Sequence, residues 1–377
     1  MRKKNNPIKK KGKTSVKQNR STRTAKVFFV ALFVIVLALS VLNLVKAKGL
    51  LIPAQPEPLV VDGVVHLDSF TLEQKIAQMT VVLWVPDLMP VWKNLQMGGV
   101  YMYSLATEGY FKQVIDGVQE GMAIPFLVTA DAEGCFTPFE SFWDFVPNKD
   151  VRTVGEAYEK GFHEGQQMKN LGFSMNFAPV VDLDDDIWGC RSFSGDEQQI
   201  AELAQAYVSG LQSQGILANA KHYPGKTLIG KDPHKFLAEA MIEKSDLVPY
   251  DYLIEKGDVA SIMVSHIITT GEIDSAAVPA VVSARVVQDL KRKFPGLVIS
   301  DEIHMQGLES FYENIDGMYI DVFKAGNDII LNFDKDPNEV HRMIQVVAEA
   351  VKDGRIPEEQ IDASVKKILE AKGLKVE

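Results

Sequence analysis

The chain has 377 residues, of which 46% are hydrophobic and 24% are charged, a composition that suits one large globular domain or two smaller ones. Its formal net charge of −10 conceals an asymmetry. Residues 1–26 carry eleven Lys or Arg and no acid, whereas the chain from Gly49 onward carries 27 basic and 50 acidic side chains. A body with this excess of acid repels phosphate groups, so nucleic acid is excluded as a partner.

An uncharged stretch, Val27–Val45, follows the basic leader. It is long enough to cross a hydrocarbon core of roughly 30 Å as a helix. The flanking positive charge should hold the N-terminal side in the cytoplasm. We therefore expect a single-pass membrane protein: a disordered cytoplasmic tail over 1–26, a transmembrane signal anchor over 27–46, a Pro-rich linker over 47–60 and an extracytoplasmic domain over 61–377. A secreted form, cleaved near Ala47, is the alternative.

Short apolar segments recur along the rest of the chain and predict β-strands. They alternate with segments of helical character, of which 197–212 and 340–352 have the clearest spacing of apolar residues three and four apart. Nearly continuous apolar strands alternating with helices predict a parallel sheet covered by helices. The expected strands are 100–103, 125–130, 174–181, 216–220, 261–264, 297–300 and 328–333.

Five of these strands run directly into ionisable residues, namely Asp131, Asp182, Lys221 with His222, His266, and Asp301. Each residue alone could be a helix N-cap or a satisfied core histidine. Burying all of them together is costly without a ligand or partners. In a (β/α)8 barrel such strand ends share one face, where these folds build active sites. A doubly wound sheet gives a similar alternation, but no Gly-rich phosphate loop is present, so we predict a single barrel domain of TIM type.

Several motifs in order then resemble glycoside hydrolase family 3. Residues 221–225, with Asp232 and His234 at the family's spacing, are similar to its Lys-His-Phe-Pro-Gly…Asp-Ser-His signature. The resemblance is closest to single-domain bacterial β-N-acetylglucosaminidases and extends over about 67–372. Further matching segments are 71–79 (the first helix), 176–182 with 191–193, 298–307 (the nucleophile segment), 324–329 and 354–365.

The resemblance implies a retaining hydrolase of β-N-acetylglucosaminides, from peptidoglycan or chitin fragments, or of another β-glucoside. It assigns the nucleophile to Asp301 and the acid/base to His234, with Asp232 polarising the imidazole. Glu302 is the local competitor as nucleophile, but we expect it to face away because neighbours along a strand alternate. No cofactor is expected.

The same resemblance implies which residues hold the sugar hydroxyls. Trp188 and Trp143 could stack on sugar faces or simply pack, and Asp184–Asp186 should be a solvated acidic loop. The Asp-x-His loop could also be half of a metal site, yet no further ligand stands at a convincing spacing, and we expect no metal. The expected sugar-binding residues are Asp131, Arg191, Lys221, His222 and His266.

The chain departs from the family pattern beside the expected site. Cys135 and Phe136 stand where the family has Gly and Arg, and Cys190 stands where it has Asp. Because the resemblance places Asp131 and Arg191 around one pocket, the two cysteines should lie close together and can form a disulfide, with two unrelated buried thiols as the alternative. Because of these changes, the resemblance does not indicate which leaving group the substrate carries.

Two other functions are compatible with the sequence. An Asp-His acid/base carries less negative charge than a carboxylate and repels phosphate less, which would suit a glycoside phosphorylase. A non-catalytic barrel that binds wall glycans is the other alternative. Retention of Asp232, His234 and Asp301 counts against it.

Overall fold

The computed structural model describes residues 16–49, 51–228, 230–257 and 259–377. The chain divides after Leu51 into an N-terminal unit and a folded body, Ile52–Glu377. Helix α1 (Val16–Ala47) dominates the first unit, so the expected disorder is wrong for residues 16–26, while residues 1–15 lie outside the described part. Lys, Arg and Gln are good helix formers and extend the apolar helix toward the N-terminus. Within α1, Phe28–Lys46 is long and apolar enough to cross a membrane, a test that a signal sequence also passes.

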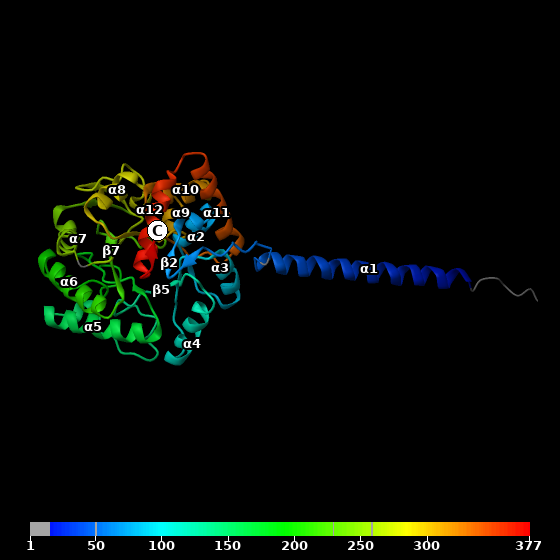
Figure 1. The fold of residues 1–377 in the computed structure, drawn as a ribbon, viewed down its shortest axis with the longest axis horizontal. Helices are drawn as coiled ribbons and strands as arrows, with labels where there is room; N and C mark the ends of the chain where they lie inside the picture. The colour runs from blue at the N-terminus through cyan, green and yellow to red at the C-terminus, as the bar shows by residue number, and fades with distance from the viewer. Residues whose placement is uncertain (1–15, 50, 229, 258) are drawn as a thin grey trace, which may run out of the picture. The chain divides into compact units, whose positions relative to one another are not determined.

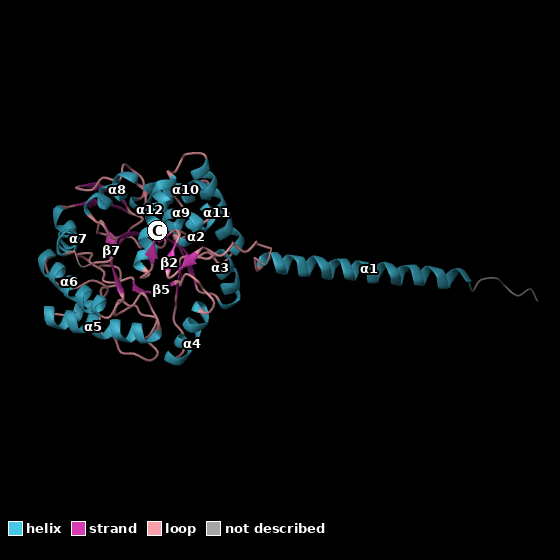
Figure 2. Ribbon diagram, viewed as in Figure 1, coloured by secondary structure: helices cyan, strands magenta, loops and turns pink. Residues whose placement is uncertain are grey.

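The body is a closed barrel of eight parallel strands, as predicted. Figure 2 shows strands in the middle of the body with helices around them. Each strand pairs with its neighbours in the order of the chain, and the last pairs with the first. The barrel strands are β3 (Thr80–Leu83), β4 (Gly99–Tyr101), β5 (Leu127–Ala130), β6 (Met175–Asn176), β7 (Leu217–Tyr223), β9 (Ser261–Val264), β11 (Leu297–Glu302) and β12 (Ile329–Asn332).

Helices connect successive strands and surround the barrel (Figure 1). The helices predicted over 197–212 and 340–352 are confirmed as α6 and α11. The helices of the body are α2 (Leu72–Gln78), α3 (Met89–Leu95), α4 (Glu108–Gln119), α5 (Val154–Leu171), α6 (Glu197–Ser213), α7 (Lys244–Lys256), α8 (Ala284–Lys293), α9 (Gln306–Glu309), α10 (Ile315–Ala325), α11 (Pro337–Lys352) and α12 (Glu358–Ala371).

One barrel strand was not predicted from the sequence, and β6 is much shorter than predicted. Strand β3 begins two residues after helix α2 ends and is followed by apolar Trp84, so neither a turn residue nor a polar strand end marks it. Strand β6 keeps only two residues of the expected 174–181, although Val180 still pairs with Lys221 of β7 through an isolated bridge.

Two small sheets lie outside the barrel. Strands β1 (Val60–Val61), β2 (Val64–Val65) and β13 (Lys375–Val376) form one, and β8 (Glu239–Ile242) pairs with β10 (Ile268–Gly271) in the other. Short 3₁₀ turns occur at Leu67–Ser69, Pro86–Leu88, Asn148–Asp150 and Ala280–Val282.

The core fills the barrel interior and the layer between strands and helices. Helices α5 and α6 pack especially closely. A Cβ atom on Gly161 would lie 2.1 Å from the Tyr207 carbonyl oxygen, and one on Gly210 would lie 2.2 Å from that of Tyr158. Such close packing over β5, β6 and β7 fixes the strand ends that carry the ionisable residues.

Candidate active site

Two adjoining cavities open at the carboxyl ends of the barrel strands. The inner cavity, about 300 Å³, is lined by strand residues that include Lys221, Asp301 and Glu302. The outer cavity, about 530 Å³, is lined mainly by residues of the loops that follow the strands. Both cavities share four residues, Tyr101, Asp131, Arg191 and His234.

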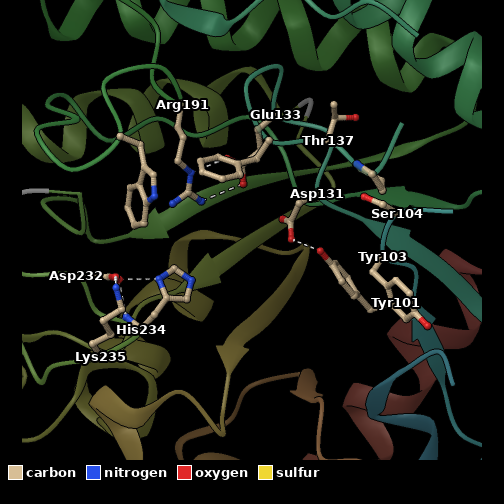
Figure 3. A pocket seen from close by; sticks show the side chains of 13 residues that line it. Tyr101, Tyr103, Ser104, Asp131, Glu133, Thr137, Arg191, Asp232, His234 and Lys235 are labelled. Atoms are coloured by element: carbon tan, nitrogen blue, oxygen red, sulfur yellow. Dashed lines mark hydrogen bonds and ion pairs between the residues drawn. The ribbon is translucent and has the colours of Figure 1, made fainter. Parts of the chain in front are cut away.

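A network of paired charges joins the ends of β5 and β7 to the loop after β6 (Figure 3). The Lys221 ammonium lies 2.5 Å from Asp131 and also pairs with Glu133. Arg191 donates to Glu133 from Nε at 2.6 Å and from Nη2 at 3.0 Å, and the Tyr101 hydroxyl donates to Asp131 at 2.9 Å. Burial would raise the pKa of Glu133, but Arg191 and Lys221 hold it well below its ordinary value. Glu133 therefore stays ionised at neutral pH, and the network presents fixed groups to a polar ligand.

His222 is held in one tautomer by Asp182. The carboxylate of Asp182, itself buried, lies 3.0 Å from Nδ1 and also accepts backbone N–H groups of His222 and Thr227. Nδ1 must therefore donate, which leaves Nε2 as an acceptor 3.4 Å from the Arg191 guanidinium. Asp182 thus sets both the ring orientation and the tautomer of His222.

Asp301 and Glu302 both line the inner cavity, so the expectation that Glu302 faces away is wrong. The ladder between β11 and β12 shifts register between Ile299 and Glu302, and this irregularity breaks the alternation of side chains. Burial alone would raise the pKa of Asp301, but nearby histidines, His266 first, hold it below its ordinary value. Burial raises the pKa of Glu302 to about 7. At neutral pH the two carboxyls therefore differ, and Asp301 is the one that stays ionised.

His266 is buried beneath this pair and is not among the residues that line either cavity. Its Nε2 donates to the Glu302 carbonyl oxygen at 2.6 Å. Burial lowers the pKa of His266, although Asp301 opposes that effect. Its position thus differs from that expected of a direct sugar ligand.

His234 reaches the cavities from the loop that follows β7. Its Nδ1 lies 2.8 Å from Asp232, which also accepts the His234 backbone N–H at 3.0 Å and pairs with Lys235 at 3.2 Å. The imidazole is about half exposed, and its ring contacts Trp188 edge to face at 5.7 Å. Since Nδ1–H donates to Asp232, Nε2 is left for proton exchange with a ligand. Within the described residues, no group of three or more His, Cys, Asp or Glu is arranged to hold a metal ion.

Cys135 and Cys190 form a disulfide with a Cα–Cα distance of 5.9 Å, which confirms the expected pairing. The bond joins the loop after β5 to the loop after β6, and the Arg191 guanidinium lies 4.7 Å from the centre of the Trp188 ring. Trp143 instead packs against Phe139 at 4.6 Å and does not line either cavity.

Asp185 is not simply part of a solvated acidic loop. Its carboxylate accepts the backbone N–H groups of Trp188, Cys190 and Arg191 at 2.7–3.0 Å. Burial would raise its pKa, but these hydrogen bonds lower it. Asp185 therefore holds the loop that carries Arg191, and its exposed neighbours Asp184 and Asp186 alone fit the expectation.

Three residues of the site were given no role from the sequence, although Asp182 was noted as an ionisable strand end. Glu133 and Asp182 each follow a predicted strand, and their acidic side chains in apolar surroundings were the available signal. Tyr101 gave no such signal, because a tyrosine inside an apolar strand is expected to pack in the hydrophobic core. Only the barrel geometry brings its hydroxyl to Asp131.

A (β/α)8 barrel whose strand ends present an ionised aspartate and a wall of paired polar groups is the architecture of a carbohydrate-active enzyme. Residues 71–371 match the sequence profile of the glycosyl hydrolase family 3 N terminal domain. The chain belongs to glycoside hydrolase family 3.

Known proteins agree with this assignment. A β-hexosaminidase of Nitrosomonas eutropha is 31% identical over 261 residues, 62% of this chain and 73% of that protein. The β-hexosaminidase LpqI of Mycobacterium bovis is 28% identical over 326 residues, 79% of this chain and 82% of that protein. A solved family 3 β-N-acetylglucosaminidase from a Paenibacillus species superimposes with a TM-score of 0.75 at 27% identity, over 81% of this chain and 62% of the other.

Proposed function

We propose that this protein is a retaining glycoside hydrolase acting on β-N-acetylglucosaminides. One observation carries the proposal: His234 lies on the wall shared by the two cavities, and the ionised Asp301 lines the inner cavity alone. A sugar in the inner cavity with its leaving group in the outer one would thus have its glycosidic oxygen near an imidazole and its ring near a carboxylate. Those are the two groups that a retaining mechanism needs.

In the first step Asp301 attacks the anomeric carbon and forms a glycosyl-enzyme. The glycosidic C–O bond breaks, and the imidazolium of His234 gives its Nε2 proton to the departing oxygen. In the second step neutral His234 takes a proton from water as that water attacks the anomeric carbon and releases Asp301. Asp232 accepts from Nδ1 throughout and stabilises the imidazolium form.

The paired charges would hold the hydroxyl groups of the sugar in the inner cavity. Asp131, Arg191, Lys221 and His222 line it and are oriented by one another before a substrate arrives. Such preorganised polar groups stabilise a transition state at little reorganisation cost. The assignment of the sugar as N-acetylglucosamine is supported by the names of the relatives, which are β-hexosaminidases and β-N-acetylglucosaminidases.

The test is turnover of a chromogenic β-N-acetylglucosaminide by the full-length protein in detergent, with the product anomer followed by NMR. We expect release of β-N-acetylglucosamine, independent of phosphate. Inversion of the anomeric centre would disprove the mechanism. A phosphate-dependent rate with a sugar phosphate as product would identify a phosphorylase, and no turnover of any aryl glycoside would favour a binding protein.

We further infer that Phe28–Lys46 anchors the protein in the cell membrane with the barrel outside. The basic leader ahead of the apolar helix supports this orientation. The Cys135–Cys190 disulfide also supports it, because such bonds persist in oxidising compartments. Protease added to spheroplasts should digest the barrel, whereas protection would refute the topology. Recovery of the protein in the medium without the helix would indicate a cleaved signal instead.

A further inference from the structure

The outer cavity has the lining that a sugar ring needs. Phe136 and Trp188 meet edge to face at 6.1 Å on its wall, and 44% of Phe136 is exposed although the side chain is large and apolar. Ser104, Thr137 and Tyr103 add hydroxyl groups to the same cavity (Figure 3). Apolar ring faces together with a few hydroxyl groups match the C–H faces and the hydroxyl rim of a pyranose.

The charges of this cavity are already paired within the protein. Asp131 pairs with Lys221, and Glu133 pairs with Arg191. In the same way, the carboxylate of Asp232 pairs with both His234 and Lys235. A charged leaving group would have to compete with these pairs, whereas a neutral one would leave them intact. The lining therefore favours an uncharged ligand.

The aromatic wall depends on the disulfide. Phe136 follows Cys135 directly, and Trp188 precedes Cys190 by two residues, so the bond ties together the two loops that supply the rings. The Arg191 guanidinium lies 4.7 Å from the Trp188 ring centre and 5.8 Å from that of Phe136. These contacts keep both rings beside the shared wall of the two cavities.

We propose that the outer cavity is a binding site for a neutral pyranose in the leaving-group position, formed by Phe136 and Trp188 and held in place by the Cys135–Cys190 disulfide. The preferred substrates are then neutral N-acetylglucosamine oligosaccharides of the chitin type, rather than glycosides whose leaving sugar carries a carboxylate. This inference rests on the proposed function, because it assumes that the reacting sugar occupies the inner cavity.

Binding to the full-length Asp301→Asn variant, which should not turn over, tests the site without relying on catalysis. Calorimetry compares N,N′-diacetylchitobiose with methyl β-N-acetylglucosaminide, which lacks the second ring. We expect the disaccharide to bind about tenfold more tightly. Adding Phe136→Ala should remove that advantage and change the affinity for the methyl glycoside much less, with Phe136→Leu intermediate. Tyr110→Ala, an exposed aromatic of α4 away from both cavities, is the matched control and should change neither affinity.

Reduction tests the disulfide separately. The chain has only two cysteines, so a phosphine reductant acts on this bond alone. We expect the reductant to lower the affinity for the disaccharide severalfold, and to have no effect on a Cys135→Ser/Cys190→Ser variant, which should already bind it weakly. Unchanged disaccharide affinity after reduction would refute the role of the disulfide.

The outcomes separate the two proposals. Equal affinities for the disaccharide and the methyl glycoside would overturn the outer site while leaving the proposed reaction standing. If the disaccharide whose second sugar is N-acetylmuramic acid, with its lactyl carboxylate, binds more tightly than N,N′-diacetylchitobiose, the preference for a neutral leaving group is overturned. Binding of neither sugar would overturn both this inference and the assignment of N-acetylglucosamine to the inner cavity.

Discussion

The inner and outer cavities are built in different ways. The inner one is lined largely by residues on or directly after barrel strands, including Lys221, Asp301 and Leu331, whose backbones are fixed by the ladder. The outer one depends on loops that are held by a disulfide and by the Asp185 carboxylate. The proposed nucleophile Asp301 thus lies on the barrel framework, while His234 and the contacts to the leaving group lie on loops.

The motifs follow the same division. Lys221, His222 and Asp301 match the family 3 motifs at the strand ends, whereas Cys135, Phe136 and Cys190 in the outer wall depart from them. The residues at the strand ends are constrained by the reaction that members of the family share. The residues of the outer wall are constrained only by the leaving group, which can differ between members.

The largest effect should come from the inner cavity. Asp301→Asn should lower kcat by roughly 10⁵-fold, because it removes the nucleophile while the side-chain volume stays the same. Steady-state kinetics with an aryl β-N-acetylglucosaminide measures the loss, and a thermal melt confirms the fold. Glu302→Gln is the matched control and should retain turnover. A trapped sugar on Glu302 would reverse the assignment of the two carboxyls.

His234→Ala probes the wall between the cavities. It should slow cleavage of alkyl glycosides by about 10²–10⁴-fold, since both proton transfers lose their acid/base. With a dinitrophenyl leaving group the first step needs little protonation, so a glycosyl-enzyme should accumulate and be visible by mass spectrometry. Asp232→Asn should give a milder loss of about tenfold, and Lys235→Ala, which touches the same carboxylate, a smaller one. Equal losses for all leaving groups would contradict the role of His234.

The pH dependence of stability distinguishes the two carboxyls of the inner cavity. Burial raises the pKa of Glu302 from an ordinary 4.5 to about 7, so the folded protein holds this proton more tightly than the unfolded chain does. That stabilisation is full below pH 4.5 and is lost as the pH rises through about 7, a change of about 3 kcal/mol.

Glu302→Gln, which cannot titrate, should therefore gain about 3 kcal/mol relative to the wild type between pH 4 and pH 8. Urea denaturation at the two pH values measures the difference. The lowered pKa of Asp301 acts in the opposite direction but is common to both proteins. A pH-independent difference between variant and wild type would show that folding leaves the pKa of Glu302 unchanged.

The smallest effect should come from the outer loop. Asp185→Ala leaves three backbone N–H groups without their acceptor, so the loop bearing Trp188 and Arg191 should loosen. We expect kcat/KM for chitobiose to fall about tenfold, and that for the methyl glycoside to fall less. Asp186→Ala, an exposed neighbour, is the control. Equal loss on both substrates would mean that Asp185 serves the inner cavity as well.

The sequence was most informative where polar residues interrupt apolar strands. Asp131, Lys221 and Asp301 could be assigned to one face of a barrel because parallel strands align their carboxyl ends. Strand β3 carries no such marker and was missed. The inward turn of Glu302 depends on a register shift between two strands, and the hydrogen bonds of Asp185 on the path of its own loop. Neither is encoded by residue type: the first arises only when two strands pair, and the second only when the loop folds on itself.

The small sheet of β1, β2 and β13 brings residues near the start of the folded body next to its last residues. Lys375 and Val376 of β13 pair with Val64 and Val65 of β2, and the Glu377 backbone bonds to both Val65 and Leu67. These backbone hydrogen bonds hold residues near the start of the folded body beside its last residues. A short peptide joining these two ends would give a circular permutant whose strands keep their spatial order in the barrel. Its new ends could open at a turn such as Gly121, where no other atoms crowd the backbone.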